Sequence, residues 1–193
     1  TDVRDTLDPN KNAAFEFCEA QPFIALRDGK VVGRIVAIIN HKANSVWNKK
    51  AVRFGWVDFI DDVEVVDALF ATVEQWGRER GMTEAHGPLG FTDFDPEGML
   101  VEGFDRIGTM ATIYNYPYYP VHMERMGYVK DVDWMEYLLT APEALPEKHA
   151  RITRIVKEKY GLRVVKYTSH SKLARERGVA IFELLNEAYA DLY

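Results

Sequence analysis

A few side chains of this 193-residue chain stand where their type could serve chemistry. His86 ends a short predicted strand just before Gly87-Pro88, where an imidazole can act as a base towards an amine, although a lone histidine more often has a structural role. Three acidic residues of the following loop, Glu97, Glu102 and Asp105, suit a cationic acceptor, but surface solvation explains them more simply.

Histidine and cysteine spacing gives no sign of a metal or redox site. The histidines are scattered at His41, His86, His122, His149 and His170. No HxxxH or CxxC spacing occurs, so we expect no metal. Cys18 lies beside Glu16 and Glu19, which should raise its pKa rather than activate its thiol. One cysteine excludes an internal disulfide and fits a cytoplasmic location.

Charge and hydropathy restrict the partners. The net charge of −6 disfavours a nucleic-acid binder, which usually has a basic face. The longest apolar run, 31–39, is far shorter than the ~20 residues of a membrane helix, and residues 1–10 are polar and acidic, unlike a signal peptide. The densest basic group is Arg151, Arg154, Lys157 and Lys159. Its spacing is typical of the solvated side of a helix, so we expect neither a nucleic-acid nor a membrane partner.

Turn signals and periodicity predict an alternation of strands and helices. The predicted elements are strands 23–26, 31–40 and 52–60, a helix from 61 to 80, a strand at 83–86, a helix at 117–126, a strand at 132–139, a helix at 147–160, a strand at 162–168 and a helix at 179–193. Residues 1–22, 41–50 and 87–111 are expected to be irregular.

Particular residues support the better-marked elements. Asp28-Gly29 between two apolar runs is a strong hairpin signal. Asp61 and Glu64 have the spacing of a capping box, and Gly81 suits the residue that follows a helix. Pro142 and Pro146 disfavour helix, so residues 141–146 are interpreted as a linker. The strand and helix beyond it cannot bury their apolar faces alone, so we expect another chain or segment to complete them.

Several stretches carry a resemblance to known proteins. They are DPNKNAAFEFCEAQPFIALRDGKVVGRIVAIIN, FGWVDFIDD, HGPLGFTDFDPEGMLVEGFD and YNYPYYPVHMERMGYVKDVDW. In this order they resemble the GNAT superfamily of N-acetyltransferases, and more narrowly a bacterial family of two-domain acetyltransferase-like proteins. The resemblance implies an α/β (α+β) acyl-CoA N-acyltransferase fold with a mixed, mostly antiparallel central sheet flanked by helices. It also implies that residues 1–140 form one domain lacking its first strand and helix, and that 147–193 begin a second, similar domain.

The resemblance also implies a site. Acetyl-CoA or another acyl-CoA would bind along strand 52–60 as co-substrate, near Phe59 and Ile60, with its pyrophosphate at the turn that holds Asp61 and Val63. An amine, from a small molecule or a peptide, would attack the acyl group directly. Asn115 matches a superfamily asparagine, although asparagine is also a common N-cap.

The general acid of the superfamily is not at its usual place. Where it often has a tyrosine, four residues before the Gly-aromatic pair, this chain has Met123. Tyr118 and Tyr119, one turn earlier, are candidate substitutes, and packing is their alternative role.

Two departures keep other functions open. The phosphate turn is acidic, with Asp61, Asp62 and Glu64, and contains no glycine, so a pyrophosphate would meet like charge. This turn and Met123 favour a degenerate, non-catalytic domain that binds a ligand or supports a neighbouring domain. A third hypothesis is a tRNA-dependent aminoacyl transferase of the cell-wall type, which the acidic balance mildly disfavours. Pairing with the second domain or with a second copy is expected in either case.

A specific structural expectation follows for the sheet. Asp58 interrupts an apolar strand, and Pro88 cannot donate to a ladder, so we expect a V-shaped opening between strand 52–60 and the strand that ends near His86. The loop 90–110 should then lie over or beside this opening, with Phe91 and Phe94 as apolar walls.

Overall fold

The computed structural model describes residues 3–109, 112–144 and 146–190. The chain divides into two compact units, residues 1–133 and 134–193. Within the described residues, no helix combines the length and apolar character needed to cross a membrane. The first unit is an α+β structure built on a four-stranded mixed sheet in the order β1-β2-β3-β4.

The predicted hairpin is confirmed. β1 (Cys18–Arg27) and β2 (Lys30–Asn40) pair antiparallel through a turn in which Asp28 and Gly29 have φ of 51° and 76°. Positive φ at both central residues matches the twist of the flanking strands, and Asp-Gly tolerates it. β1 begins five residues before the predicted strand, inside the stretch that we expected to be irregular.

The second half of the sheet pairs in two directions. β3 (Ala51–Phe59), predicted as a strand at 52–60, is antiparallel to β2, and β4 (Glu84–His86) is parallel to β3. The β2–β3 register shifts between Arg34 and Val36, and Trp56 there has a φ of 44°. This is a β-bulge, which bends the strand locally.

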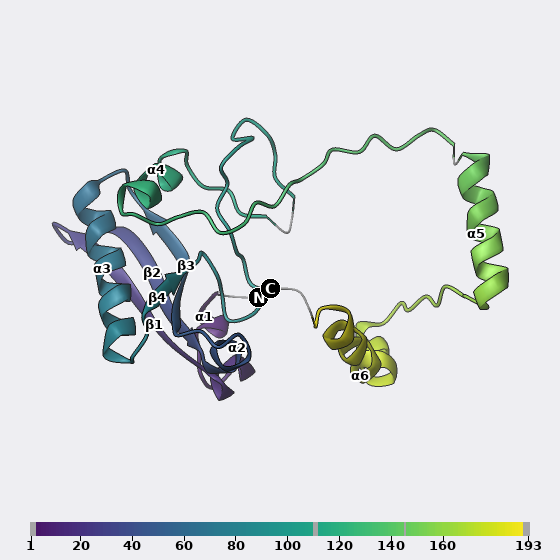
Figure 1. The fold of residues 1–193 in the computed structure, drawn as a ribbon, viewed down its shortest axis with the longest axis horizontal. Coiled ribbons are helices and arrows are strands. Elements are labelled where there is room, and N and C mark those ends of the chain that lie inside the picture. Colours follow the sequence, from purple (N-terminus) through teal and green to yellow (C-terminus); the bar gives the residue numbers. More distant parts are fainter. Residues whose placement is uncertain (1–2, 110–111, 145, 191–193) are drawn as a thin grey trace. The chain divides into compact units, whose positions relative to one another are not determined.

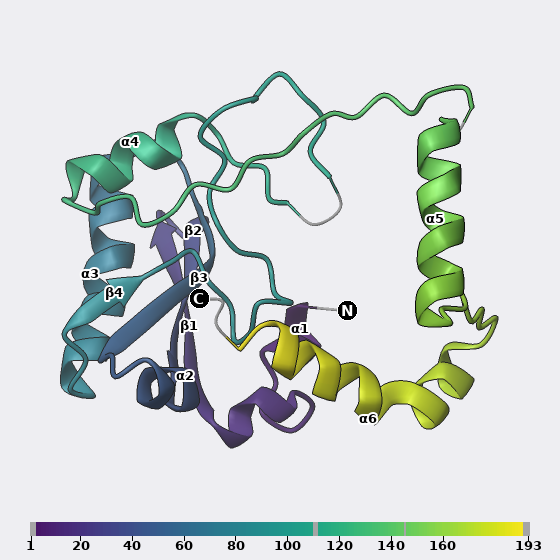
Figure 2. The ribbon, with the colours of Figure 1, turned by 45° about the vertical axis from the view of Figure 1, so that its right-hand side comes forward.

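One amphipathic helix covers one face of the sheet. α3 (Val63–Glu79) lies along it in Figures 1 and 2. Its buried side chains recur at helical spacing: Val65, Val66, Leu69, Phe70, Val73 and Trp76. The helix approaches closely, because a Cβ on Gly77 would meet Val52 Cγ1 at 2.7 Å. Full burial of each large apolar side chain contributes about 1.5–3 kcal/mol, so this face is the main core.

The opposite face has a smaller core. Phe91, Val36, Ile38, Cys18 and Ala14 are buried there together. η1 (Ala13–Glu16) and the loop that carries Phe91 supply the covering residues, and the Phe15 and Phe91 rings lie 5.0 Å apart. Phe91 is therefore a core residue, whereas Phe94 is 82% exposed and forms no wall.

Two segments that we expected to be irregular contain short helices. α1 (Val3–Thr6) and η1 precede β1, and α2 (His41–Val46) follows β2. Asparagine caps explain two of them, since Asn12 accepts from the Ala14 amide at 3.0 Å and Asn40 from the Ala43 amide at 2.8 Å.

The expected opening beside β4 was wrong. Pairing is continuous from Ala51↔Glu84 to Arg53↔His86. The chain then stays beside β3, because the Leu89 amide donates to the Phe54 carbonyl at 2.8 Å. Proline at 88 ends the strand without separating the two segments. β3 continues beyond Gly55, where β4 no longer runs beside it. The loop 90–110, whose last residue lies outside the described residues, therefore has no opening to cover.

In the second unit, the helices form but the predicted strands do not. α5 (Glu147–Tyr160) has the predicted bounds, and Gly161 follows it with a φ of 61°. α6 (His170–Ala188) begins nine residues before the predicted helix, because the Ser169 hydroxyl caps it at the Lys172 amide. The last predicted helical residues, 191–193, lie outside the described residues. Residues 132–139 and 162–168 pair with no strand among the described residues, and a strand needs a partner to satisfy its backbone.

Candidate functional site

The end of β3 is held by two tyrosines of α4 (Tyr118–Arg125). The Tyr118 hydroxyl donates to the Phe59 carbonyl at 2.8 Å, and the Phe59 amide donates to the Tyr119 hydroxyl at 3.3 Å. Both backbone groups of Phe59 that point away from β2 therefore have partners. The helix ends as predicted, since Gly127 has a φ of 87°. Figures 1 and 2 both show α4 beside the end of α3 that follows β3.

Aromatic packing fixes these tyrosines. The rings of Phe59 and Tyr119 are stacked with centroids 4.2 Å apart, and Tyr116 stacks on Tyr118 at 5.5 Å. Tyr119 is buried, whereas Tyr118 is half-buried. The sequence-based prediction placed Tyr118, Tyr119 and Phe59 in one site, and the structure brings them together.

Both tyrosines hold their protons firmly. Burial, assisted by the carboxylate of Asp58, raises the pKa of Tyr119 to about 12, and burial also raises the pKa of Tyr118. The Tyr119 hydroxyl lies 3.3 Å from Asp58 Oδ1 and is hydrogen-bonded to it. Each hydroxyl has one proton, and these geometries direct it to Asp58 and to the Phe59 carbonyl. In this arrangement, neither tyrosine can protonate a leaving group without first breaking a hydrogen bond.

A histidine–carboxylate pair anchors α4 on the turn between β3 and α3. His122 is buried, and its Nε2 lies 2.8 Å from Asp61 Oδ1. Arg125 Nε lies 3.4 Å from His122 Nδ1. Because a guanidinium only donates, Nδ1 is the accepting nitrogen, and Nε2 then donates to Asp61. This pair positions α4, and the imidazole is not open to a substrate.

The prediction that Asp61 caps α3 was wrong. The N-cap is Asp62, whose Oδ1 accepts from the Val65 amide at 3.1 Å. Arg27, at the end of β1, forms two bonds to Asp62 at 2.7 and 3.1 Å and one to Glu64 at 2.9 Å. Those bonds to Arg27 hold the pKa of Asp62 at about 2. The turn is therefore less negative than the sequence indicated, because Arg27, distant in sequence, offsets part of the negative charge of Asp62 and Glu64.

Ile60 and Val63, the other predicted cofactor residues at this turn, are both exposed. The Ile60 amide donates to the Val32 carbonyl at 3.1 Å, which extends the pairing with β2. Their exposure leaves this turn accessible from solvent.

Asn115 lies on the loop before α4 and is buried. Its Oδ1 accepts from the Leu100 amide at 2.6 Å, and its Nδ2 donates to the Leu100 and Tyr116 carbonyls, each at 3.1 Å. The residue at the cap position of α4 is Pro117, with no side-chain cap bond. Asn115 is thus neither a helix cap nor a side chain with spare donors for a cofactor; it fastens two loop segments together.

His86 belongs to a different part of the sheet. It ends β4 opposite Arg53, whereas Phe59 lies six residues further along β3, about 20 Å at the rise of a strand. His86 Nε2 lies 3.0 Å from Asp131 Oδ2. Burial lowers the pKa of His86, and Asp131 opposes that shift. The structure does not bring His86 together with the tyrosines.

The other candidates from the sequence are dispersed. Burial raises the pKa of Glu97. Glu102 and Asp105 lie on the surface of the loop. The pKa of Cys18 is about 11, and the main cause is burial, not the neighbouring glutamates that we expected. Among residues 3–109, 112–144 and 146–190, no three His, Cys, Asp or Glu side chains cluster as metal ligands would.

Sequence reasoning missed His122, Arg27 and Asp131. His122 was considered only as a metal ligand, and its partner Asp61 is 61 residues away in sequence. Arg27 and Asp62 are 35 residues apart. No local pattern marks such pairs. The signal that could have found His122 is its spacing of three residues from Tyr119, which places both on one side of α4.

Two curated proteins are similar to this chain. It is 30% identical over 189 residues to the bacterial ceramide synthase of Caulobacter vibrioides, covering 97% of this chain and 48% of that protein. It is 33% identical over 130 residues to protein YghO of Escherichia coli, covering 65% of this chain and 33% of that one. The chain therefore spans less than half the length of these relatives. No protein-family model matches it, and no solved structure does.

Proposed function

We propose that the chain is part of an N-acyltransferase that moves an acyl group from acyl-CoA to the amine of a long-chain amino alcohol. The observation that carries this proposal is the 30% identity to a bacterial ceramide synthase across 97% of the chain. A ceramide is the amide of a fatty acid and such an amine, so its formation is an acyl transfer to nitrogen. The resemblance to the GNAT superfamily, an expectation from sequence motifs, supports the same reaction type.

The reaction needs two proton transfers close to one carbonyl. The amine nitrogen attacks the thioester carbon, a C–N bond forms, the C–S bond breaks, the amine loses a proton and the thiolate gains one. Acid and base must lie within hydrogen-bond reach of the reacting atoms, about 3 Å. Since His86 and Phe59 are about 20 Å apart along β3, His86 and the tyrosines cannot serve the same carbonyl.

We assign the base role to His86. Its lowered pKa leaves the imidazole neutral near pH 7, and Asp131 at 3.0 Å would stabilise the imidazolium that forms. A thioester arm lying along β3 from the turn at Asp61 would place its reacting end towards Gly55, where the chain from His86 to Leu89 runs beside the strand. Tyr118 and Tyr119 would then position the opposite end of the strand and not protonate the thiolate.

The test uses the whole chain with an acyl-CoA and a long-chain amino alcohol. Mass spectrometry follows the amide, and a thiol reagent follows released CoA. His86→Asn should abolish amide formation, whereas Glu84→Gln, on the same strand and exposed, should leave it intact. Equal activity of the His86→Asn protein would remove His86 from the mechanism, and amide formation absent in every variant would remove the proposal.

A non-catalytic role in ligand binding or in support of a partner domain is the alternative. One observation favours it: the tyrosine hydroxyls already occupy the Phe59 backbone groups that a pantetheine arm would need. In that case the chain binds no acyl-CoA in calorimetry at millimolar ligand. The tRNA-dependent aminoacyl transferase has no comparable observation in its favour.

A further inference from the structure

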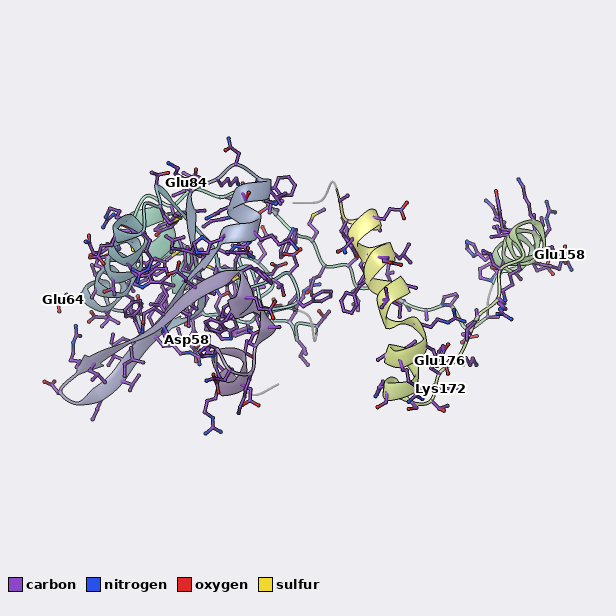
Figure 3. All side chains as sticks on the ribbon, turned by 90° about the horizontal axis from the view of Figure 1, so that it is seen from below. Asp58, Glu64, Glu84, Glu158, Lys172 and Glu176 are labelled. Atoms are coloured by element: carbon purple, nitrogen blue, oxygen red, sulfur yellow. The ribbon has the colours of Figure 1, made fainter. Side chains whose placement is uncertain are left out.

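The second unit contains a strongly basic segment within an acidic chain. Between residues 147 and 177 there are ten Lys and Arg against three Glu, a net charge of +7, in a chain whose net charge is −6. These cations are Lys148, Arg151, Arg154, Lys157, Lys159, Arg163, Lys166, Lys172, Arg175 and Arg177. All ten side chains are exposed, and among the described residues Lys172 alone of them lies within 4 Å of a carboxylate, that of Glu176 at 3.9 Å. Figure 3 shows these two residues together on α6.

Apolar residues accompany the cations on α5. Ile152, Ile155 and Val156 have the spacing of one helix face, and they are 46%, 47% and 36% exposed. No residue of α5 is buried, and Figure 3 shows its side chains, Glu158 among them, projecting all around the helix. In the described part of the second unit, this face stays largely open to solvent, and only the segment after Gly161 is found against it.

The chain after α5 enlarges the apolar surface. A shallow groove runs between the helix and the segment that follows Gly161, and its walls are aliphatic, from Ile152, Val156, Leu162 and Val164. Lys157 and Arg163 also line it. An aliphatic groove bordered by cations matches a phospholipid, which presents acyl chains beneath an anionic phosphate.

We propose that α5 and residues 161–165 bind the surface of a membrane that contains anionic phospholipids. A helix with aliphatic side chains on one face and Lys and Arg on the other is typical of segments that lie in the membrane interface. The stems of Lys and Arg run along apolar surface while their charges reach the headgroups. The inference stands on the second unit alone and is independent of the proposed function. It revises the expectation of no membrane partner, which rested on the lack of a spanning segment and on the interpretation of these basic residues as a solvated helix side.

A lipid surface fits better than an acidic protein for a geometric reason. Arg151, Arg154 and Lys157 follow one another at three-residue spacing and lie on one side of α5, opposite the aliphatic residues. An acidic protein would match these cations alone, whereas a lipid interface also takes up the aliphatic side chains of the other side. A membrane interface contacts the helix along its whole length, with headgroups on both flanks. Binding to an acidic protein is the outcome that the experiment below distinguishes.

The first test measures co-sedimentation of the whole chain with vesicles. Binding should be strong with mixed phosphatidylcholine and phosphatidylglycerol, weak with phosphatidylcholine alone, and weaker at high salt. Each cation near an anionic surface contributes about fivefold to partitioning, so Arg151→Gln, Arg154→Gln and Lys157→Gln together should reduce it roughly a hundredfold. A matched control neutralises three exposed cations of the first unit, Lys30, Lys50 and Arg106, and should change binding little.

The second test separates insertion from simple charge attraction. Ile152→Ser with Ile155→Ser keeps every charge and should reduce binding at least tenfold. Each change removes an aliphatic side chain whose transfer from water into the lipid stabilises the bound state. Circular dichroism of each variant checks that the helices persist. No binding to anionic vesicles, an equal loss in the control variant, or unchanged binding of the double serine variant would each overturn the proposal. The first of these results would leave an acidic protein as the partner.

Discussion

The bond between His122 and Asp61 should hold α4 on the turn between β3 and α3, and a double-mutant cycle can measure it. A hydrogen bond to a charged group contributes about 1.5–3 kcal/mol, and the lower end applies here because the Asp61 side chain is 66% exposed. We expect His122→Phe, which keeps an aromatic ring against Phe59, to destabilise the first unit by about 1–2 kcal/mol. Asp61→Ala should cost a similar amount, since Asp61 is not the cap of α3.

Urea unfolding followed by tryptophan fluorescence gives the free energies. A loss of about 1 kcal/mol lowers the midpoint by roughly 0.3–1 M, given slopes of about 1–3 kcal/mol/M. The double variant should be as stable as the less stable of the two single variants, because both changes remove the same bond. Asp67→Ala is the matched control: it breaks the exposed Arg125–Asp67 pair, at 2.6 Å, which joins α4 to α3 itself, and it should cost less than about 1 kcal/mol. Strict additivity of His122→Phe and Asp61→Ala would refute the anchoring role.

Three further predictions concern the same end of the sheet. Tyr118→Phe frees the Phe59 carbonyl, and calorimetry should show acyl-CoA bound up to about fivefold more tightly, the equivalent of one hydrogen bond; weaker binding would contradict the view that the hydroxyl blocks this group. Glu64→Gln neutralises a carboxylate on a side chain that is 88% exposed and leaves the Asp62 cap in place. It should therefore also tighten acyl-CoA binding by reducing like charge at the turn, and unchanged affinity would refute the charge argument. Asp62 has a pKa of about 2, below its ordinary value of about 3.9, so its contribution to stability is present above about pH 4 and is lost as the pH falls towards 2. Asp62→Asn should therefore flatten the acid dependence of stability in that range, and an unchanged slope in acid titration would argue against the Arg27 contacts as the cause.

Local signals allowed the elements with sharp ends to be predicted. Asp28-Gly29 fixed the hairpin, and Pro146 and Gly161 fixed both ends of α5. The short helix α2 was not predicted, because its only sequence signal is the Asn40 cap. Residues 132–139 and 162–168 have the composition of strands, but composition cannot show whether a neighbouring strand exists.

The candidate site could be predicted only in part, for a related reason. Tyr118, Tyr119 and Phe59 were found through their motif, but the resemblance assigned Phe59 to a ligand, and the tyrosines themselves satisfy its backbone. The anchoring pair of His122 and Asp61 depends on contacts across 61 residues. Such contacts follow from the packing of α4 on the sheet, and no sequence window contains both partners.

The most direct test of the account is the product formed by the whole chain from a long-chain acyl-CoA and a long-chain amino alcohol. We predict an amide, identified by mass spectrometry, with one CoA thiol released for each amide formed, and loss of both in the His86→Asn protein. Thiol release without an amide, or an amide formed equally by the His86→Asn protein, would contradict the account.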